Sequence, residues 1–186
     1  WSVGKQRIFV NSGTSLYGTG NERLRQRKTA AHNTVVVDGE DSSEVWSGFR
    51  VARRAYSKVL NTTGTDECVS VTASHDGYCR LRSPVVHQRT VSLSGDGLLV
   101  SDMLDGSFRN AVAHFHLHPL VKVTRVSSNE IFIHLPSGEL YQFKSSVPCL
   151  KVASTWHPHF GISIPSTKIT VPFVGPNLLV SVILKV

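Results

Sequence analysis

Hydrophobic and polar positions alternate with a period of two residues over much of the chain. Clear examples are Cys68–Ser74, Val121–Val126 and Glu130–Leu135, where apolar side chains occupy every second position. A period of two places these side chains on one face of an extended segment, so each pattern predicts a half-buried β-strand. Further strands are predicted over residues 7–10, 34–37, 49–60, 85–93, 98–104, 111–117, 140–144, 161–171 and 178–186.

Short turn-forming sequences separate these segments. They are Asp38-Gly39, Asp76-Gly77, Gly95-Asp96-Gly97, Asp105-Gly106 and Pro136-Ser137-Gly138. Strands that recur every 8 to 12 residues with turns between them are typical of antiparallel sandwiches and barrels. We therefore predict an all-β fold, an antiparallel β-sandwich of about a dozen strands, with residues 1–186 forming a single domain.

Only residues 21–31 have any helical character. The charged residues of this segment fall on every side of a helix and leave no apolar stripe to bury. We therefore expect a solvated loop that carries Glu22, Arg23, Arg25, Arg27 and Lys28.

The composition agrees with a folded β-protein. The chain has 25 valines against 8 alanines, and β-branched side chains favour strands over helices. No apolar run approaches the roughly 18 residues that would predict a membrane span. With 40% hydrophobic and 18% charged residues, the chain is too apolar for a disordered polyelectrolyte. Because the first residue is Trp1 and the only methionine is Met103, we expect a fragment of a longer protein.

The formal charge of +7 favours an anionic partner. A positive field attracts acidic polysaccharide, nucleic acid and anionic lipid alike, so charge alone does not choose among them. Nucleic acid ranks last, because the sequence shows no basic stripe interleaved with aromatic residues and no nucleic-acid-binding motif.

The three cysteines, Cys68, Cys79 and Cys149, form no C-x-x-C pair. An odd number cannot all pair internally. A bridge between Cys68 and Cys79 across a hairpin is conceivable, but we favour three unpaired thiols.

The densest chemical signal is a basic loop that leads into a strand. Residues 13–18 and 23–28 precede His32 and Asn33, which open the strand beside several arginines. Arginine binds a carboxylate or sulfate through two parallel hydrogen bonds, and histidine donates to an anion or accepts a proton near neutral pH. The pattern indicates an anion-binding site. In the simpler alternative, His32 only caps a strand and the arginines are solvated.

Three histidines, His114, His116 and His118, alternate along one predicted strand. Alternate residues share a face, and three imidazoles are a known zinc ligand set. Because the segment has no evident carboxylate partner and Pro119 ends it, we favour a strand face with partly exposed histidines over a metal site.

An ordered set of motifs runs from about Val10 to Pro119. The motifs are Gly13-Thr14, Tyr17, Arg27, Ala31-His32-Asn33-Thr34-Val35, Val37-Asp38-Gly39, Trp46, Phe49-Arg50, Arg53, Ser74–Tyr78, His87–Val91 and Phe115–Pro119. In this order they resemble the carboxy-terminal region of the heparinase II/III-like family of polysaccharide lyases.

The resemblance implies a β-sandwich that packs, in the complete enzyme, against an amino-terminal α/α toroid absent from this chain. Such enzymes cleave uronate-containing polysaccharides by β-elimination. The implied catalytic residue is His32, as a proton-transfer or carboxylate-neutralising group. The implied substrate-binding residues are Tyr17, Arg27, Asn33, Arg50 and His75.

Some members of the family hold a structural zinc through two histidines and an aspartate. Thr34 stands where one of these histidines is expected, and a hydroxyl is a poor zinc ligand. His75 would be the more distant ligand. The resemblance therefore implies a possible zinc site, and the threonine at position 34 counts against it.

The favoured function is the sandwich domain of a lyase for acidic glycans, nearly inactive without its toroid. The alternative is a non-catalytic module that binds an acidic glycan or plays a structural role, with the basic residues 23–28 and 50–54 holding the sugar. The family favours a periplasmic or secreted location.

Overall fold

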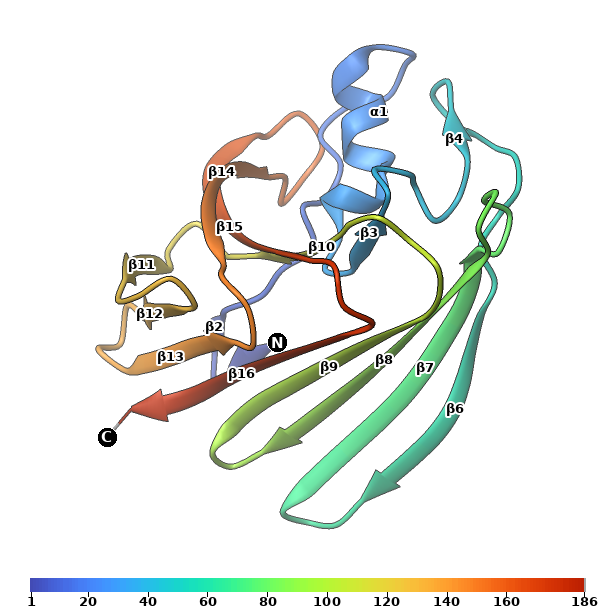
Figure 1. Cartoon of the computed structure of the whole chain (residues 1–186). Coiled ribbons are helices and arrows are strands. Elements are labelled where there is room, and N and C mark those ends of the chain that lie inside the picture. Colours follow the sequence, from blue (N-terminus) through green and yellow to red (C-terminus); the bar gives the residue numbers. More distant parts are fainter. Residues whose placement is uncertain (186) are drawn as a thin grey trace.

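The computed structural model describes residues 1–185, which form sixteen strands, one α-helix and one 3-10 helix. Two antiparallel sheets face each other and contain twelve of these strands (Figure 1). The four-stranded sheet has the order β14 (Leu150–Trp156), β15 (Ile164–Phe173), β10 (Ala111–His116) and β3 (Val35–Val37). The eight-stranded sheet has the order β11 (Lys122–Arg125), β12 (Glu130–His134), β13 (Leu140–Ser145), β16 (Asn177–Lys185), β9 (Gly97–Gly106), β8 (Val85–Ser94), β7 (Cys68–Tyr78) and β6 (Ser57–Gly64).

The predicted antiparallel β-sandwich is confirmed. The four remaining strands have two residues each and form two small hairpins. These strands are β1 (Ser2–Val3), β2 (Gln6–Arg7), β4 (Val45–Trp46) and β5 (Arg50–Val51).

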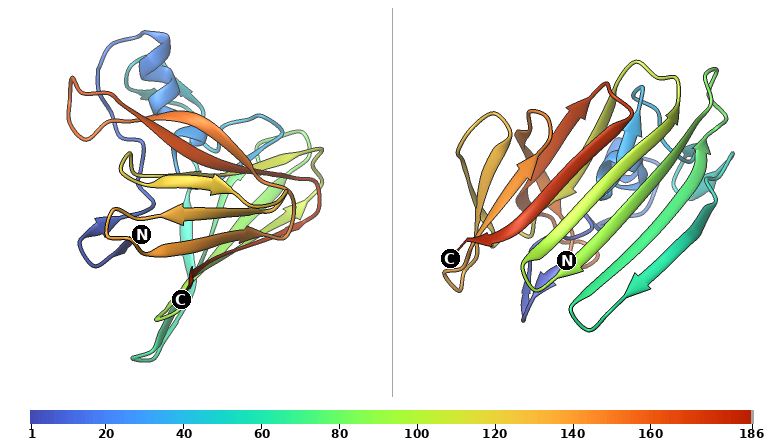
Figure 2. Two further views of the ribbon diagram at one scale, coloured as in Figure 1. Left: turned by 90° about the vertical axis from the view of Figure 1, so that its left-hand side faces the viewer. Right: turned by 60° about the horizontal axis from the view of Figure 1, so that its bottom comes forward.

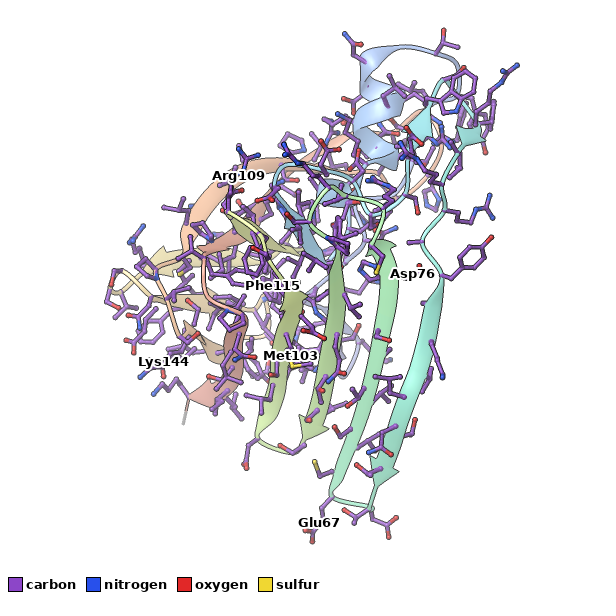
Figure 3. All side chains as sticks on the ribbon, turned by 45° about the vertical axis from the view of Figure 1, so that its right-hand side comes forward. Glu67, Asp76, Met103, Arg109, Phe115 and Lys144 are labelled. Atoms are coloured by element: carbon purple, nitrogen blue, oxygen red, sulfur yellow. The ribbon has the colours of Figure 1, made fainter. Side chains whose placement is uncertain are left out.

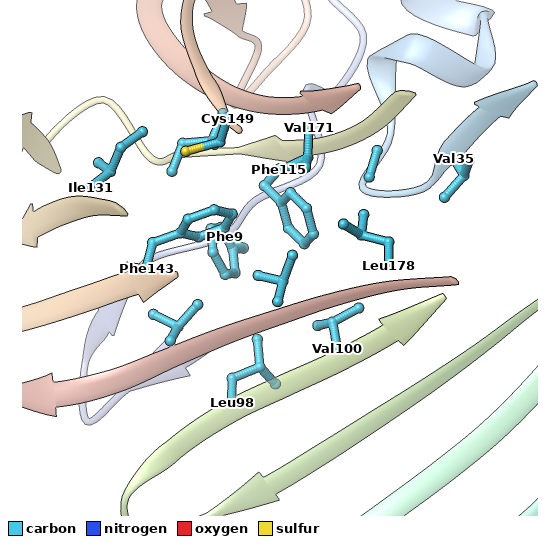
Figure 4. Close-up of a cluster of buried hydrophobic side chains, with 14 of the residues drawn as sticks. Phe9, Val35, Leu98, Val100, Phe115, Ile131, Phe143, Cys149, Val171 and Leu178 are labelled. Atoms are coloured by element: carbon cyan, nitrogen blue, oxygen red, sulfur yellow. The ribbon is translucent and has the colours of Figure 1, made fainter. Parts of the chain in front are cut away.

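The core lies between the two sheets because alternate side chains of facing strands point into that space. On β9, Leu98, Val100 and Leu104 are buried, whereas Leu99 and Met103 are exposed. Burial of each large apolar side chain contributes about 1.5–3 kcal/mol. The aromatic rings in the centre come from both sheets and from the segment before α1, with Phe9, Phe115 and Phe143 in mutual proximity (Figure 4).

The eight-stranded sheet extends beyond the four-stranded sheet that packs on it. Every residue of β6 is exposed, and the hairpin of β6 and β7 extends away from the body with Glu67 at its tip (Figure 3). The helix α1 (Asn21–Arg27) lies at the other end of the molecule (Figure 2, left). No helix within residues 1–185 has the length and apolar character needed to cross a bilayer.

The solvated loop expected over residues 21–31 is wrong, because α1 and a 3-10 helix, η1 (Thr29–Ala31), occupy this segment. The buried side of α1 is polar instead of apolar. Gln26 donates to the Ser15 hydroxyl at 2.7 Å and accepts from the Ser15 amide at 2.9 Å. Arg23 donates to the Gly48 carbonyl at 3.0 Å. This helix is therefore held by hydrogen bonds to neighbouring loops and not by an apolar stripe.

Three local predictions also differ from the structure. The strand predicted over residues 7–10 is absent beyond Arg7, where β2 ends, and Phe9 forms only an isolated bridge with Leu117. The segment 49–60 contains two strands, β5 and β6, instead of one. Asp76-Gly77 lies within β7 at an irregularity in the pairing with β8, and does not reverse the chain. Glycine is required there, because a Cβ at position 77 would collide with the Ser42 carbonyl oxygen.

All three cysteines are unpaired, as predicted. Cys68 begins β7 and Cys79 directly follows its end, so eleven strand residues span the distance between them. At about 3.3 Å per residue the two lie roughly 35 Å apart. A disulfide requires Cα atoms within about 7 Å.

Candidate functional site

A cleft of about 850 Å³ lies beside α1, η1 and the segment that connects β3 with β6. Most of its lining residues have polar or charged side chains, and they include three arginines and one histidine. The lining residues are Thr14, Arg23, Gln26, Arg27, Thr29, His32, Thr34, Ser42, Ser43, Val45, Val51, Arg54 and Ser57.

His32 enters the cleft wall directly after η1. Its backbone amide donates to the Thr29 carbonyl at 3.1 Å, which fixes the chain at the end of the 3-10 turn. The ring atom Nδ1 lies 2.7 Å from Oδ1 of Asn11. Because an amide oxygen only accepts, Nδ1 carries the proton and Nε2 of the neutral ring keeps a free lone pair.

Burial lowers the pKa of His32, although the charge of Asp41 partly opposes this shift. The imidazole is therefore neutral at pH 7, with a preset tautomer. A neutral ring with a free Nε2 is suited to accept a proton from a bound ligand.

Two of the cleft arginines, Arg27 and Arg54, differ in how many of their N–H donors already have a hydrogen-bond partner. Arg27 donates to the carbonyls of Trp46, Ser47 and Arg50 at 2.7–3.2 Å and so holds the β4–β5 hairpin. By contrast, the guanidinium of Arg54 has no hydrogen-bond partner within residues 1–185. Arg54 is therefore the cation best placed to meet an anionic ligand.

From the sequence, Arg54 was named only as part of the basic segment 50–54 of the alternative glycan-binding module, and not among the predicted site residues. The sequence signal that could have identified Arg54 is the pair Arg53-Arg54, which lies close to Arg50. Sequence alone does not separate the two neighbours, yet Arg53 forms an ion pair with Glu44 at 2.8 Å and Arg54 lines the cleft.

Asn33 does not line the cleft, and its carboxamide contacts the backbone. Nδ2 donates to the Val10 carbonyl at 3.0 Å, and Oδ1 accepts from the His116 amide at 2.6 Å. The Asn33 carbonyl accepts from Arg89 at 2.6 Å. Asn33 therefore positions the chain next to His32.

His75 lies on β7, does not line the cleft, and is half-buried at the end of a chain of hydrogen-bonded polar groups. Its Nε2 is 3.0 Å from Nδ1 of His87, and the Nε2 of His87 is 2.7 Å from Asp102. Burial and then the neighbouring charge of His87 lower the pKa of His75 to about 4. Arg89 completes the chain with two hydrogen bonds to Asp102 at 2.7 and 2.8 Å.

The remaining two predicted ligands lie at the outer rim. Tyr17 is exposed and contacts the rings of Phe49 and Phe160. Arg50 is exposed and its guanidinium stacks over Trp46 at 4.7 Å. Neither residue lines the cleft itself.

The three histidines of the 114–118 segment do not form one cluster. His114 and His116 are buried and stacked with ring centroids 6.4 Å apart, which corrects the expectation of partial exposure. His118 instead packs against Trp156. The 3-10 helix η1 packs against β10 on the side of His116, whose Nε2 lies 3.0 Å from the Ala30 carbonyl.

The sequence model of the family described as heparinase II/III-like, C-terminal, matches residues 1–181 of this chain. The chain belongs to the heparinase II/III-like family. The β-sandwich, the cleft and His32 thus form part of the carboxy-terminal domain of that family.

Solved structures of heparinases share the fold. A heparan sulfate lyase, HepC from Pedobacter heparinus, superposes with a TM-score of 0.77 at 15% identity, covering 99% of this chain and 30% of that one. A heparinase III structure superposes with a TM-score of 0.76 at 13% identity, covering 97% and 28%. The chain therefore spans about 30% of the length of these structures. Comparison with curated protein sequences finds no match.

The zinc that some heparinase II/III-like proteins hold does not fit the residues of this chain. Nε2 of His75 faces His87, and Nδ1 accepts from the Gly77 amide at 3.2 Å, so neither ring nitrogen is free. Thr34 offers only a hydroxyl. Within residues 1–185, no group of three or more histidine, cysteine or acidic side chains is placed to bind a metal ion.

Proposed function

We propose that this chain is the sandwich domain of a polysaccharide lyase that cleaves a uronate-containing acidic glycan by β-elimination. The observation that carries the proposal is the basic cleft in which a neutral His32 lies with the free cation of Arg54. Membership of the heparinase II/III-like family and the likeness to heparan sulfate lyase HepC support it. We place the protein in the periplasm or outside the cell, where such polymers are accessible.

The proposed reaction removes the proton at C5 of a uronate and breaks the bond between C4 and the glycosidic oxygen. The electron pair of the C5–H bond forms the C4=C5 double bond, and the leaving oxygen takes a proton. Negative charge accumulates on the uronate carboxylate as C5 is deprotonated. The site therefore needs a cation or hydrogen-bond donors directed at that carboxylate and groups that transfer the two protons.

In this proposal His32 transfers one of the protons through Nε2. The hydrogen bond between Nδ1 and Asn11 fixes the orientation of the ring, and the lowered pKa keeps Nε2 unprotonated at neutral pH. Arg54 binds the carboxylate and offsets its developing charge. A toroid domain of the same protein supplies the remaining groups, so the 186-residue chain alone is expected to be nearly inactive.

The test is an ultraviolet assay of the full-length protein on a panel of heparan sulfate, chondroitin sulfate, hyaluronan and alginate. The new C4=C5 bond is conjugated with the carboxylate and absorbs in the ultraviolet. We expect one or more polymers to give this signal and His32→Ala to reduce kcat by about 10²–10⁴-fold, the range for loss of a proton-transfer group.

His159→Ala is the matched control, because His159 is an exposed histidine outside the cleft. Normal turnover of His32→Ala would overturn the site assignment. If the full-length protein bound these polymers without releasing unsaturated products, the non-catalytic glycan-binding function would replace the lyase.

A further inference from the structure

We propose that Tyr17, Phe49 and Phe160 form a stacking site for one sugar ring of the acidic polysaccharide, next to the cleft. These three residues are called the aromatic platform below. The inference rests on the proposed function, since it adds a subsite to the same glycan-binding region.

The aromatic platform is an exposed cluster of rings. The ring of Tyr17 lies 5.3 Å from that of Phe49 and 5.0 Å from that of Phe160, measured between centroids. The side chains are 60%, 67% and 62% exposed, respectively. Phenylalanine normally lies in the core, so two such rings gathered on the surface mark an interaction site.

Tight backbone contacts between loops bring Tyr17 and Phe160 together. Gly13 has a φ of +78°, and a Cβ there would collide with the carbonyl oxygen of His157. Two residues after Gly13, the Ser15 carbonyl accepts from the Gly161 amide at 2.7 Å. These contacts join the loop before α1 to the loop between β14 and β15.

A second close approach places Phe49. A Cβ on Gly48 would collide with the carbonyl oxygen of Gly18, so glycine allows the β4–β5 turn to lie directly against the loop before α1. The aromatic platform is therefore held in place by three segments that are far apart in the sequence. A site that is already formed loses little conformational entropy when a ligand binds.

Arg23 connects the aromatic platform to the cleft. This residue lines the cleft and is only 8% exposed. Its guanidinium carbon lies 5.3 Å from the centroid of Tyr17 and 5.5 Å from that of Phe49. Nε donates to the Gly48 carbonyl and Nη1 to the Thr14 hydroxyl, whereas Nη2 has no partner within residues 1–185.

A sulfated or uronate-bearing sugar matches both features of this surface. The apolar C–H face of a pyranose ring packs on an aromatic ring, as apolar groups do on aromatic faces generally. An anionic substituent of the same or the next sugar accepts from the free Nη2 of Arg23. An apolar protein surface would instead cover this guanidinium without an acceptor, which is costly. The combination of rings and cation therefore favours a glycan.

The test is calorimetric titration of the 186-residue chain with heparan sulfate tetrasaccharide and octasaccharide at several salt concentrations. We expect the octasaccharide to bind more tightly, because it reaches both the cleft and the aromatic platform. Phe49→Ala and Phe160→Ala should each weaken octasaccharide binding about fivefold to tenfold and leave the tetrasaccharide unchanged. The slope of log Kd against log salt should not change, because these rings carry no charge.

Two comparison variants separate this proposal from the proposed function. Arg54→Gln should weaken binding of both oligosaccharides and reduce the salt slope by about one, because it removes a cation from the cleft. Leu120→Ala should change nothing, since Leu120 is equally exposed, at 65%, and lies outside both sites. Thermal unfolding checks that each variant is folded.

Unchanged octasaccharide binding by both phenylalanine variants would overturn the aromatic platform, and a normal effect of Arg54→Gln in the same series would leave the cleft assignment standing. Loss of octasaccharide affinity in the phenylalanine variants without an effect of Arg54→Gln would support the aromatic platform and count against the cleft. Absence of octasaccharide binding by the unmodified chain would overturn the aromatic platform, whereas the proposed function is decided by the ultraviolet assay of the full-length protein. A concentration-dependent dimer that Phe49→Ala abolishes in sedimentation would assign the rings to protein contact instead.

Discussion

Substitution of Asp102 by asparagine should strongly destabilise the fold. Asp102 lies on β9 with 0% exposure and accepts three hydrogen bonds, one from His87 and two from Arg89, at 2.7–2.8 Å. Asparagine keeps the shape but removes the charge, and it replaces one acceptor oxygen by an NH₂ group that faces a donor. Arg89 is then left as a largely buried, uncompensated cation.

Breaking one side of a buried ion pair costs about 3–5 kcal/mol, and we expect Asp102→Asn to lower the free energy of unfolding at pH 7 by this amount. The pH dependence has a definite sign. Burial alone would raise the pKa of Asp102, but the charge of Arg89 and the hydrogen bonds from His87 and Arg89 outweigh it and lower the pKa. The native carboxylate therefore adds stability above about pH 4, the value of an unfolded aspartate, and this contribution is lost as the pH falls through the native pKa.

Urea unfolding followed by circular dichroism measures the effect, with an unchanged m-value as the sign of an intact two-state transition. Asp105→Asn is the matched control, because Asp105 lies on the same strand but is exposed. A loss below about 1 kcal/mol for Asp102→Asn, similar to that of Asp105→Asn, would show that the buried network does not stabilise the sandwich as argued.

Two other properties can be checked on the unmodified chain. Burial lowers the pKa of His114 to about 3 and that of His116 to about 4, so between pH 6.5 and 4 the unfolded state binds protons that the native state does not. Urea titrations should show stability falling on acidification, by about 2 kcal/mol per histidine at pH 5, and His116→Gln should flatten the curve. A thiol reagent should label the exposed Cys68 and Cys79 quickly in the native protein and the buried Cys149 only after unfolding, whereas rapid labelling of all three would contradict the packing of Cys149.

The sandwich was predictable because most of its strands have one buried face and one exposed face. The strand β9 shows the rule, with buried Leu98, Val100 and Leu104 alternating with exposed neighbours. The strand β14 was missed because none of its residues is fully buried, so no alternation appears in its sequence. Its place at the edge of the four-stranded sheet depends on pairing with β15, a long-range contact that a local pattern does not contain.

The helix α1 was missed for a different reason. The apolar-stripe rule assumes that a helix packs on a core, whereas α1 is fixed by polar contacts of Arg23 and Gln26 with other loops. The partners of these contacts become neighbours only after folding. For the same reason, the sequence indicated His32 and a basic loop but not the separation of roles among Arg27, Arg53 and Arg54.

The position of His32 depends on both sheets. Asn33, the next residue, is held through its side chain by the β10 backbone, and its carbonyl accepts from Arg89, which is itself fixed by Asp102 on β9. The buried polar chain therefore supports the backbone that presents the imidazole, although none of its members lines the cleft. Substitutions should therefore distinguish residues of the cleft from residues that support it. His32→Ala removes a partly exposed ring and should leave the stability of the fold nearly unchanged. Asp102→Asn removes the support on which both the fold and the geometry of the cleft depend.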